Sequence, residues 1–278
     1  MAESSRSSTW SLFIGQTAYQ TRIFIRNPLA AFFTLVFPLM IFLVFSVIFG
    51  NETIDYLGVT TAQYYAPSMA VFAAVSATYT NLAVGTAYQR DQGILKRMKG
   101  TPLPPWIYMS GKIASAVMVA TVSVVILMSI GVVFYGVQIY ARTLPAAIIT
   151  FLVGVGCFAA LGLMVAALVS TGESATAVAN ATLLPLAFFS GVFIVPAEDA
   201  PAWLDTVANI FPLKHFVEPF VAAFNPQFVG AQFWWGSILY MILWGVLGIV
   251  IALRYFKWES SPGKQRRSRK GRREAAAT

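Results

Sequence analysis

The sequence predicts an all-α integral membrane protein with six transmembrane helices, and three observations predict this class. Hydrophobic residues make up 58% of the 278 residues, charged residues only 11%, and the mean hydropathy is +0.70. Such a composition is typical of membrane proteins. Six uncharged apolar runs are each long enough for a helix to cross a bilayer, which takes about 20 residues. The runs lack the alternation of barrel strands, so helices must satisfy their backbone.

The six runs define a transmembrane domain over residues 29–256. They are Leu29–Gly50, Tyr65–Gln89, Ile113–Ile139, Pro145–Val169, Ala175–Pro196 and Phe233–Leu253. Pro38 and Pro185 interrupt the first and fifth runs, and we expect each to kink its helix. Small residues four positions apart should let helices approach closely. The pairs are Gly162/Ala166 and Ala70/Ala74.

The positive charges lie almost entirely on one side of this predicted topology. Of the 19 Lys and Arg residues, seventeen fall in the N-terminal segment, the loop after the second run and the C-terminal tail. The loop cations are Arg90, Lys96, Arg97, Lys99 and Lys112. Only Arg142 and Lys214 lie in the loops on the opposite side. Because cytoplasmic loops collect Lys and Arg, both termini are predicted to be cytoplasmic.

Residues 1–28 form a cytoplasmic segment in which Trp10–Asn27 is predicted to be an amphipathic helix. Its apolar arc consists of Phe13, Phe24, Thr17, Trp10, Thr21, Ile14, Ile25 and Ala18. Arg22 and Arg26 lie on the other side, as in a helix that rests in the headgroup layer. The alternative is an extension of the first span, but Asn27-Pro28 favours a break there.

Residues 257–278 form a basic tail that contains KQRRSRKGRR. Its composition predicts disorder and attraction to anionic lipid. The tail has neither a folded nucleic-acid-binding module nor stacking aromatics, so we expect no nucleic-acid partner.

The segment between the fifth and sixth runs is unusually apolar for an external loop. Ser190 to Pro226 carries many aliphatic and aromatic residues, but five prolines break it. Short helices that dip back into the outer leaflet fit both facts, and we expect a re-entrant hairpin over 197–226.

The chain lacks the sequence features of an enzyme that hydrolyses nucleotides. Neither Gly111-Lys112 nor Gly263-Lys264 has the glycine and hydroxyl residue of a phosphate-binding loop. With one cysteine and one histidine, a zinc site of the usual kind cannot form, and no cofactor is expected in this chain. An intramembrane hydrolase built on His215, with Asp205 or Glu218 and Ser190, is a minor alternative.

No charged residue falls at membrane depth in the six runs, so a driving energy must enter from outside them. Uncharged polar residues do occur there. With Phe188 and Phe189, the candidate lining of a substrate path is Thr78, Asn81 and Asn180. Hydrogen bonding between helices explains these polar residues equally well.

The stretch RDQGILKRMKGTPLP, residues 90–104, is the most polar part of the chain before the tail. Ile94, Leu95 and Met98 fall on one face of a short helix and the cations on the other. Such a helix suits a groove on a partner protein. A helix that rests on lipid headgroups is the alternative.

These features together resemble the type 2 permeases of ATP-binding cassette exporters, in particular the drug- and lipid-exporter branch. The first matching motif consists of Arg90, Asp91, Gly93, Leu95, Lys96, Arg97, Thr101, Pro102 and Leu103. The second is Ser190-Gly191-Val192-Phe193, then Pro196, Pro201, Trp203-Leu204, Pro212-Leu213 and His215. Gln89, where an acid is usual, Lys214, where a small hydroxyl residue is usual, and Pro219-Phe220 depart from the pattern.

The resemblance implies two permease subunits, alike or different, and two cytoplasmic ATPase subunits that hold ATP and Mg²⁺. It places the chain in a bacterial plasma membrane, where it would export hydrophobic or amphipathic small molecules such as drugs, lipids or natural products. The residues implied to couple it to the ATPase are Arg90, Asp91, Gly93, Ile94, Leu95, Arg97 and Met98. Export of polysaccharide or teichoic acid by the same architecture is the second reading, and a non-transporting membrane scaffold or the hydrolase is the third.

Overall fold

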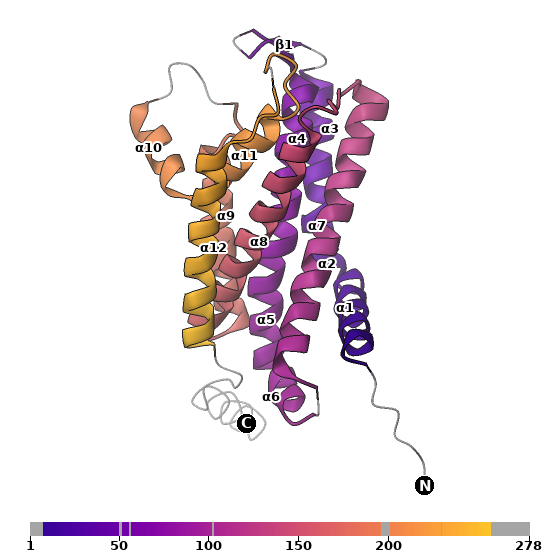
Figure 1. Cartoon of the computed structure of the whole chain (residues 1–278), viewed down its shortest axis with the longest axis vertical. Helices are drawn as coiled ribbons and strands as arrows, with labels where there is room; N and C mark the ends of the chain where they lie inside the picture. The colour runs from indigo at the N-terminus through magenta and orange to yellow at the C-terminus, as the bar shows by residue number, and fades with distance from the viewer. Residues whose placement is uncertain are drawn as a thin grey trace, which may run out of the picture.

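The computed structural model describes residues 8–49, 52–55, 57–101, 103–195, 201–228 and 230–256, and the side chain of Lys99 is left out. Within these residues the chain is an elongated helical bundle whose long helices run along one axis (Figure 1). The predicted tail, 257–278, and the first residues of the predicted re-entrant hairpin, 197–200, lie outside this part of the chain.

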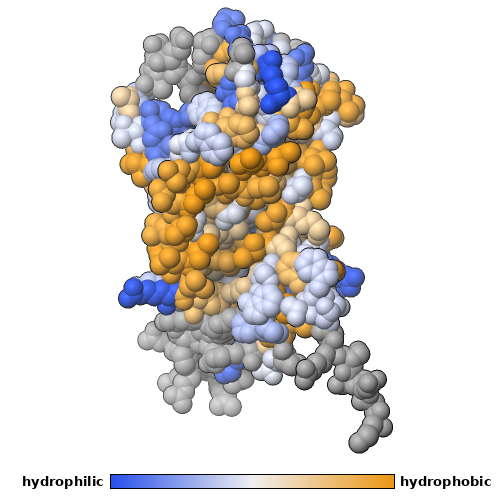
Figure 2. All heavy atoms as spheres, in the orientation of Figure 1, coloured by the Kyte–Doolittle hydropathy of each residue, from blue (hydrophilic) through white to orange (hydrophobic). Residues whose placement is uncertain are grey.

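Five helical segments in the described part are long and apolar enough to cross a membrane. They are Pro28–Ile48, Thr61–Asp91, Pro105–Tyr135, Leu144–Leu168 and Trp235–Tyr255. A broad hydrophobic band crosses the middle of the face seen in Figure 2, with more hydrophilic surface toward both ends. These segments correspond to the first, second, third, fourth and sixth predicted runs, so the structure supports an all-α, multi-pass membrane protein.

The fifth predicted run, Ala175–Pro196, is not among those five segments. It forms α9, Gly172–Phe189, a helix of 18 residues, and Pro196 lies outside the described residues. Polar residues such as Glu173 and Asn180 lower the mean hydropathy of this helix. The structure therefore confirms helix formation here, whereas the prediction of six spans is not confirmed.

Proline and glycine set the ends of the third helix, α7, Pro105–Tyr135. A proline at the first helical position costs no hydrogen bond, so the helix begins there and not at Ile113. It ends before Gly136, which has φ 68°, a left-handed conformation that favours glycine. Lys112, which the sequence placed in a loop, is consequently a buried residue of this helix.

The first two spanning segments each contain a π-helical turn. The first comprises α2, Pro28–Ala31, η1, Phe32–Val36, and α3, Phe37–Ile48, so its π-turn lies immediately before Pro38. The second comprises α4, Thr61–Val75, η2, Ser76–Thr80, and α5, Asn81–Asp91. Such turns are uncommon and occur frequently at functional sites.

The predicted close approach at Gly162 is confirmed. Gly162 lies in α8, Leu144–Leu168, and a Cβ atom there would stand 2.5 Å from the carbonyl oxygen of Tyr79. Glycine thus lets α8 pack directly on the backbone of η2.

The predicted N-terminal helix is α1, Thr9–Ile25, which packs against α7 (Figure 1). Trp10, Ile14 and Ile25 of the predicted apolar arc are exposed, whereas the buried side chains are Gln16, Gln20 and Phe24. The break at Asn27-Pro28 is confirmed, since Asn27 Oδ1 accepts a hydrogen bond of 3.2 Å from the backbone N–H of Ala30 at the start of α2.

The opposite end of the bundle carries two short helices and a two-stranded hairpin. The helices are α10, Ala202–Ile210, and α11, Pro212–Ala222, and they precede α12, Trp235–Tyr255. The strands are β1, Thr53–Ile54, and β2, Val59–Thr60, which pair antiparallel. Helix α11 is largely buried against α4, α8 and α12, so the apolar external segment does form short helices. We call this the hairpin end and the other the α6 end.

Candidate functional site

The predicted coupling segment forms the tip of the bundle at its α6 end (Figure 1). Helix α5 ends at Asp91, and Gly93 turns the chain with φ 70°. Helix α6, Ile94–Lys99, follows, and Thr101 Oγ1 donates a 2.7 Å hydrogen bond to the carbonyl of Met98. The left-handed conformation at Gly93 explains why glycine stands between the two helices.

Arg90 joins the end of α5 to the end of α8. Its Nη1 donates to the Ala166 carbonyl at 2.7 Å and its Nη2 to the Val169 carbonyl at 2.6 Å. The last carbonyls of a helix have no partner within the helix and carry partial negative charge. A guanidinium, with several donors in a fixed plane, suits two such oxygens at once. Arg90 is only 4% exposed.

Asp91 makes the complementary contact with the next helix. Its Oδ2 accepts a 2.6 Å hydrogen bond from the backbone N–H of Gly172, the first residue of α9. The amide groups at a helix start carry partial positive charge, which a carboxylate stabilises. The ring of Tyr88 covers Gly172 so closely that a Cβ atom would lie 2.6 Å from it. The end of α5 therefore holds the turn between α8 and α9 from both sides.

The remaining predicted coupling residues differ in exposure. Leu95 is fully buried and holds α6 on the bundle, whereas Ile94 and Met98 are half-buried and Arg97 is exposed. A periodicity argument could not separate Leu95 from its apolar neighbours, because all three fall on one helix face.

The structure also contains a buried polar cluster that the sequence analysis did not identify. Lys112 Nζ and Tyr108 Oη both donate to Gln89 Oε1 at 2.5 Å, and Gln89 Nε2 donates to Gln20 Oε1 at 3.4 Å. The cluster joins α1, α5 and α7. In the part of the chain that the structure describes, no carboxylate forms an ion pair with Lys112. The one available signal was Gln89, which stands where the resembled family usually has an acid.

The candidate path residues differ in exposure. Thr78 is fully buried, and its Oγ1 donates back to the Ala74 carbonyl at 2.8 Å. Asn81 is half-buried, whereas Asn180, Phe188 and Phe189 are exposed on α9. Other residues make a direct polar contact between η2 and α9: Tyr79 Oη lies 2.7 Å from Thr182 Oγ1.

The ring nitrogens of His215 meet a serine other than Ser190 and, where a triad would need a carboxylate, a backbone carbonyl. Its Nδ1 lies 3.3 Å from Ser237 Oγ, and its Nε2 lies 3.1 Å from the Asn209 carbonyl. Both ring nitrogens are therefore occupied by residues other than Ser190. Over the described residues, no three His, Cys, Asp or Glu side chains gather to hold a metal ion.

Five long apolar helical segments define a multi-pass membrane protein, in which the end of α5 holds the turn between α8 and α9. The chain belongs to the ABC-2 type transporter family, whose model matches residues 12–225. In this family the chain is the transmembrane permease subunit and not the ATPase.

Two relatives are similar over much of the chain. "Probable multidrug ABC transporter permease YbhR" of Escherichia coli K12 is 26% identical over 168 residues, 60% of this chain and 44% of that protein. "Daunorubicin resistance ABC transporter permease protein DrrB1" of Streptomyces coeruleorubidus is 26% identical over 187 residues, 65% of this chain and 62% of that protein. The chain thus matches less than two thirds of the length of either relative.

Proposed function

We propose that this chain is the membrane-spanning subunit of an ATP-driven exporter of hydrophobic or amphipathic small molecules. The observation that carries the proposal is the double contact of Arg90 and Asp91 with the turn between α8 and α9. Through this contact, a force on α6 at the tip reaches α5, α8 and α9. The multidrug and daunorubicin-resistance names of the two relatives favour this class of substrate.

In this proposal the α6 end faces the cytoplasm of a bacterial cell, together with both termini. Seventeen of the 19 Lys and Arg residues fall on that side, as the positive-inside rule requires. Helix α9, the fifth predicted run, completes the six spans. At about 1.5 Å per residue its 18 residues reach close to the roughly 30 Å of the hydrocarbon core.

The energy is supplied by a cytoplasmic ATP-binding cassette partner, which holds ATP and Mg²⁺. The partner contacts the exposed residues of α6, Arg97 in particular, with Ile94 and Met98 at the edge of the contact. Because Leu95 is fully buried, α6 moves together with the end of α5. Arg90 and Asp91 then carry the displacement to α8 and α9.

The substrate passes between two copies of the permease. Exposed residues of α9, among them Asn180, Phe188 and Phe189, line this path, and Asn81 adds a polar group from the second span. A surface that mixes amides with aromatic rings suits amphipathic molecules. Thr78 stabilises the backbone near η2 and lies behind the path.

Export from a reconstituted complex tests the proposal. The chain is purified together with its bound ATPase and placed in vesicles with the α6 end outward. ATP-dependent uptake of a fluorescent amphiphile into these vesicles is then measured. Arg97→Glu should lower uptake at least tenfold. Arg22→Glu, which reverses an exposed cation on α1, is the matched control and should leave uptake within twofold.

Unchanged uptake in Arg97→Glu, with the ATPase still bound, would refute coupling through α6. ATP hydrolysis by the purified chain without a partner would refute the division of labour between the two subunits.

A further inference from the structure

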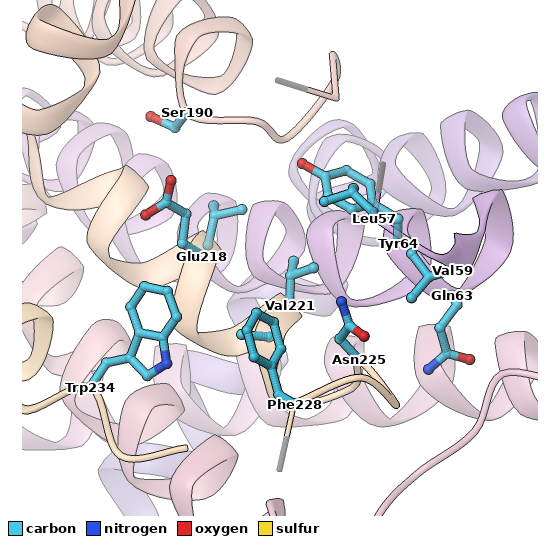
Figure 3. A pocket seen from close by; sticks show the side chains of 12 residues that line it. Leu57, Val59, Gln63, Tyr64, Ser190, Glu218, Val221, Asn225, Phe228 and Trp234 are labelled. Atoms are coloured by element: carbon cyan, nitrogen blue, oxygen red, sulfur yellow. The ribbon is translucent and has the colours of Figure 1, made fainter. Parts of the chain in front are cut away.

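A cavity of about 270 Å³ lies at the hairpin end, remote from the coupling tip (Figure 3). Helices α4 and α11, the hairpin and the segment before α12 enclose it. Most of the lining is apolar, and these residues are Leu57, Val59, Val217, Val221, Phe228 and Trp234. A volume of this size accommodates the apolar part of a small organic molecule.

One carboxylate faces this apolar cavity. Glu218 belongs to the lining, and its side chain is 40% exposed. The nearest cation, Lys214, stands 3.5 Å from Glu218 Oε1 and also pairs with Asp205. One ammonium group therefore serves two carboxylates. Arg142, whose Nη2 donates to the Phe228 carbonyl at 3.1 Å, is a second cation near the cavity, and among the described residues it pairs with neither carboxylate.

A second polar group of the lining lacks a partner. Ser190 is 2% exposed, and in the described part of the chain its Oγ has no hydrogen-bond partner. Figure 3 shows its side chain on the side of the cavity toward which the Glu218 carboxylate points. A buried hydroxyl without a partner costs free energy, which a bound donor would recover.

The Gln63 amide of the lining is already engaged. Its Nε2 donates to the carbonyls of Gln138 and Phe224 at 2.9 and 2.6 Å, and its Oε1 accepts from the backbone N–H of Gln138 at 2.8 Å. Asn225 Oδ1 accepts from the backbone N–H of Gln227 at 2.9 Å. The polar groups left to receive a ligand are the Glu218 carboxylate, the Ser190 hydroxyl and the Asn225 NH₂ group, and among them only the carboxylate carries a charge.

We propose that this cavity binds a small amphipathic cation, an organic ammonium ion. Its charged group donates to Glu218 and to Ser190 Oγ, and its apolar part fills the space beside Val221, Phe228 and Trp234. An anion is disfavoured by the Glu218 carboxylate, the one charged side chain of the described lining. A fully apolar molecule would leave both acceptors unpaired. The site goes beyond the proposed function, under which it faces the outside.

Binding to the full chain in phosphatidylcholine nanodiscs tests the site without the ATPase. The probe is 4-phenylbutylammonium, and 4-phenylbutanol is its neutral counterpart; empty nanodiscs give the lipid background. Glu218→Gln should weaken binding of the cation at least tenfold and binding of the alcohol less than twofold. Glu52→Gln, an exposed glutamate of the same end, is the matched control and should change neither.

Lys214→Met gives a test of opposite sign, since it removes the cation that competes for Glu218. It should strengthen binding of 4-phenylbutylammonium at least threefold. The proposal is overturned if 4-phenylbutylammonium shows no saturable binding, or if Glu218→Gln weakens the binding of both probes equally. It is also overturned if Lys214→Met weakens the binding of 4-phenylbutylammonium. If the wild-type complex shows no ATP-driven export while the binding results are as expected, the proposed function is contradicted and the binding site is not.

Discussion

Arg90 and Asp91, adjacent at the end of α5, hold the ends of two successive helices with opposite charges. The guanidinium donates to the carbonyls of Ala166 and Val169, where α8 ends. The carboxylate accepts from the N–H of Gly172, where α9 begins. Each charge thus meets the helix end of opposite sign. Arg90 and Asp91, which belong to the predicted coupling segment, therefore also join the end of α5 to the turn between α8 and α9.

Arg90→Met should destabilise this joint. The change removes two charge-assisted hydrogen bonds and leaves one buried and one part-buried carbonyl without their donor, which costs about 1.5–3 kcal/mol in the free energy of unfolding. The melting temperature of the purified chain in detergent measures the loss. Arg22→Met is the control, because Arg22 is exposed on α1, and its melting temperature should stay close to that of the wild type. Equal melting temperatures for the two variants would show that the joint carries no stability.

Gly162→Ala should destabilise the contact between α8 and η2. The new methyl group would stand 2.5 Å from a backbone carbonyl of Tyr79, so one helix must shift, at about 1–3 kcal/mol. Gly156→Ala on the same helix meets nothing within 4 Å. It should be neutral or stabilising by about 0.5–1 kcal/mol, since alanine favours the helix. Thermal unfolding compares the two, and a Gly162→Ala protein as stable as Gly156→Ala would contradict the close approach.

Uncharged apolar runs and their proline and glycine boundaries were sufficient to predict most of the helices. The start of α7 was placed too late because Lys112 was assigned to a loop on account of its charge. The partner of the buried Lys112 is Gln89, which lies 23 residues away in the chain, and hydropathy cannot report such a partner. The packed face of α1 was missed for the same reason: Gln16 and Gln20 are buried through tertiary contacts.

The candidate site was predictable as a segment and not as a set of contacts. The charge pattern located residues 90–104 at the tip, and Gly93 marked the turn. Nothing local to Arg90 shows that its partners lie on α8, since these are backbone carbonyls and any sequence supplies them. The burial of Leu95 likewise depends on how α6 folds back on the bundle.

The charged cluster at the hairpin end should make stability depend on pH in two windows. Burial raises the pKa of Glu218 above its ordinary value of 4.5, against the opposing effect of Lys214. The folded protein therefore binds the proton more tightly, and this contribution to stability is full below 4.5 and lost as pH rises through the raised pKa. Hydrogen bonding from Lys214 lowers the pKa of Asp205 below 3.8, so its contribution is full above 3.8 and lost as pH falls.

Melting temperatures between pH 3 and pH 8 separate the two groups. Relative to the wild type, Glu218→Gln should gain stability as pH rises above 4.5, because the variant never has to ionise beside the cavity. Asp205→Asn should lose stability near neutral pH and approach the wild type below pH 3.8. The Asp205 effect should be small, since its side chain is 63% exposed. A Glu218→Gln curve parallel to that of the wild type would contradict the raised pKa.

Gln89→Glu should stabilise the chain. Lys112 Nζ, buried with an amide oxygen at 2.5 Å, would then meet a carboxylate. The existing hydrogen bond from Lys112 would gain a charged acceptor, which is worth about 1 kcal/mol more than a neutral one, less the cost of burying the carboxylate. The Gln20 amide can rotate toward the carboxylate, since its Nε2 has no partner among the described residues. Melting temperature in detergent measures the gain. Gln92→Glu, an exposed position one turn on, is the control and should change little. Destabilisation by Gln89→Glu alone would mean that Lys112 is neutral in the folded protein.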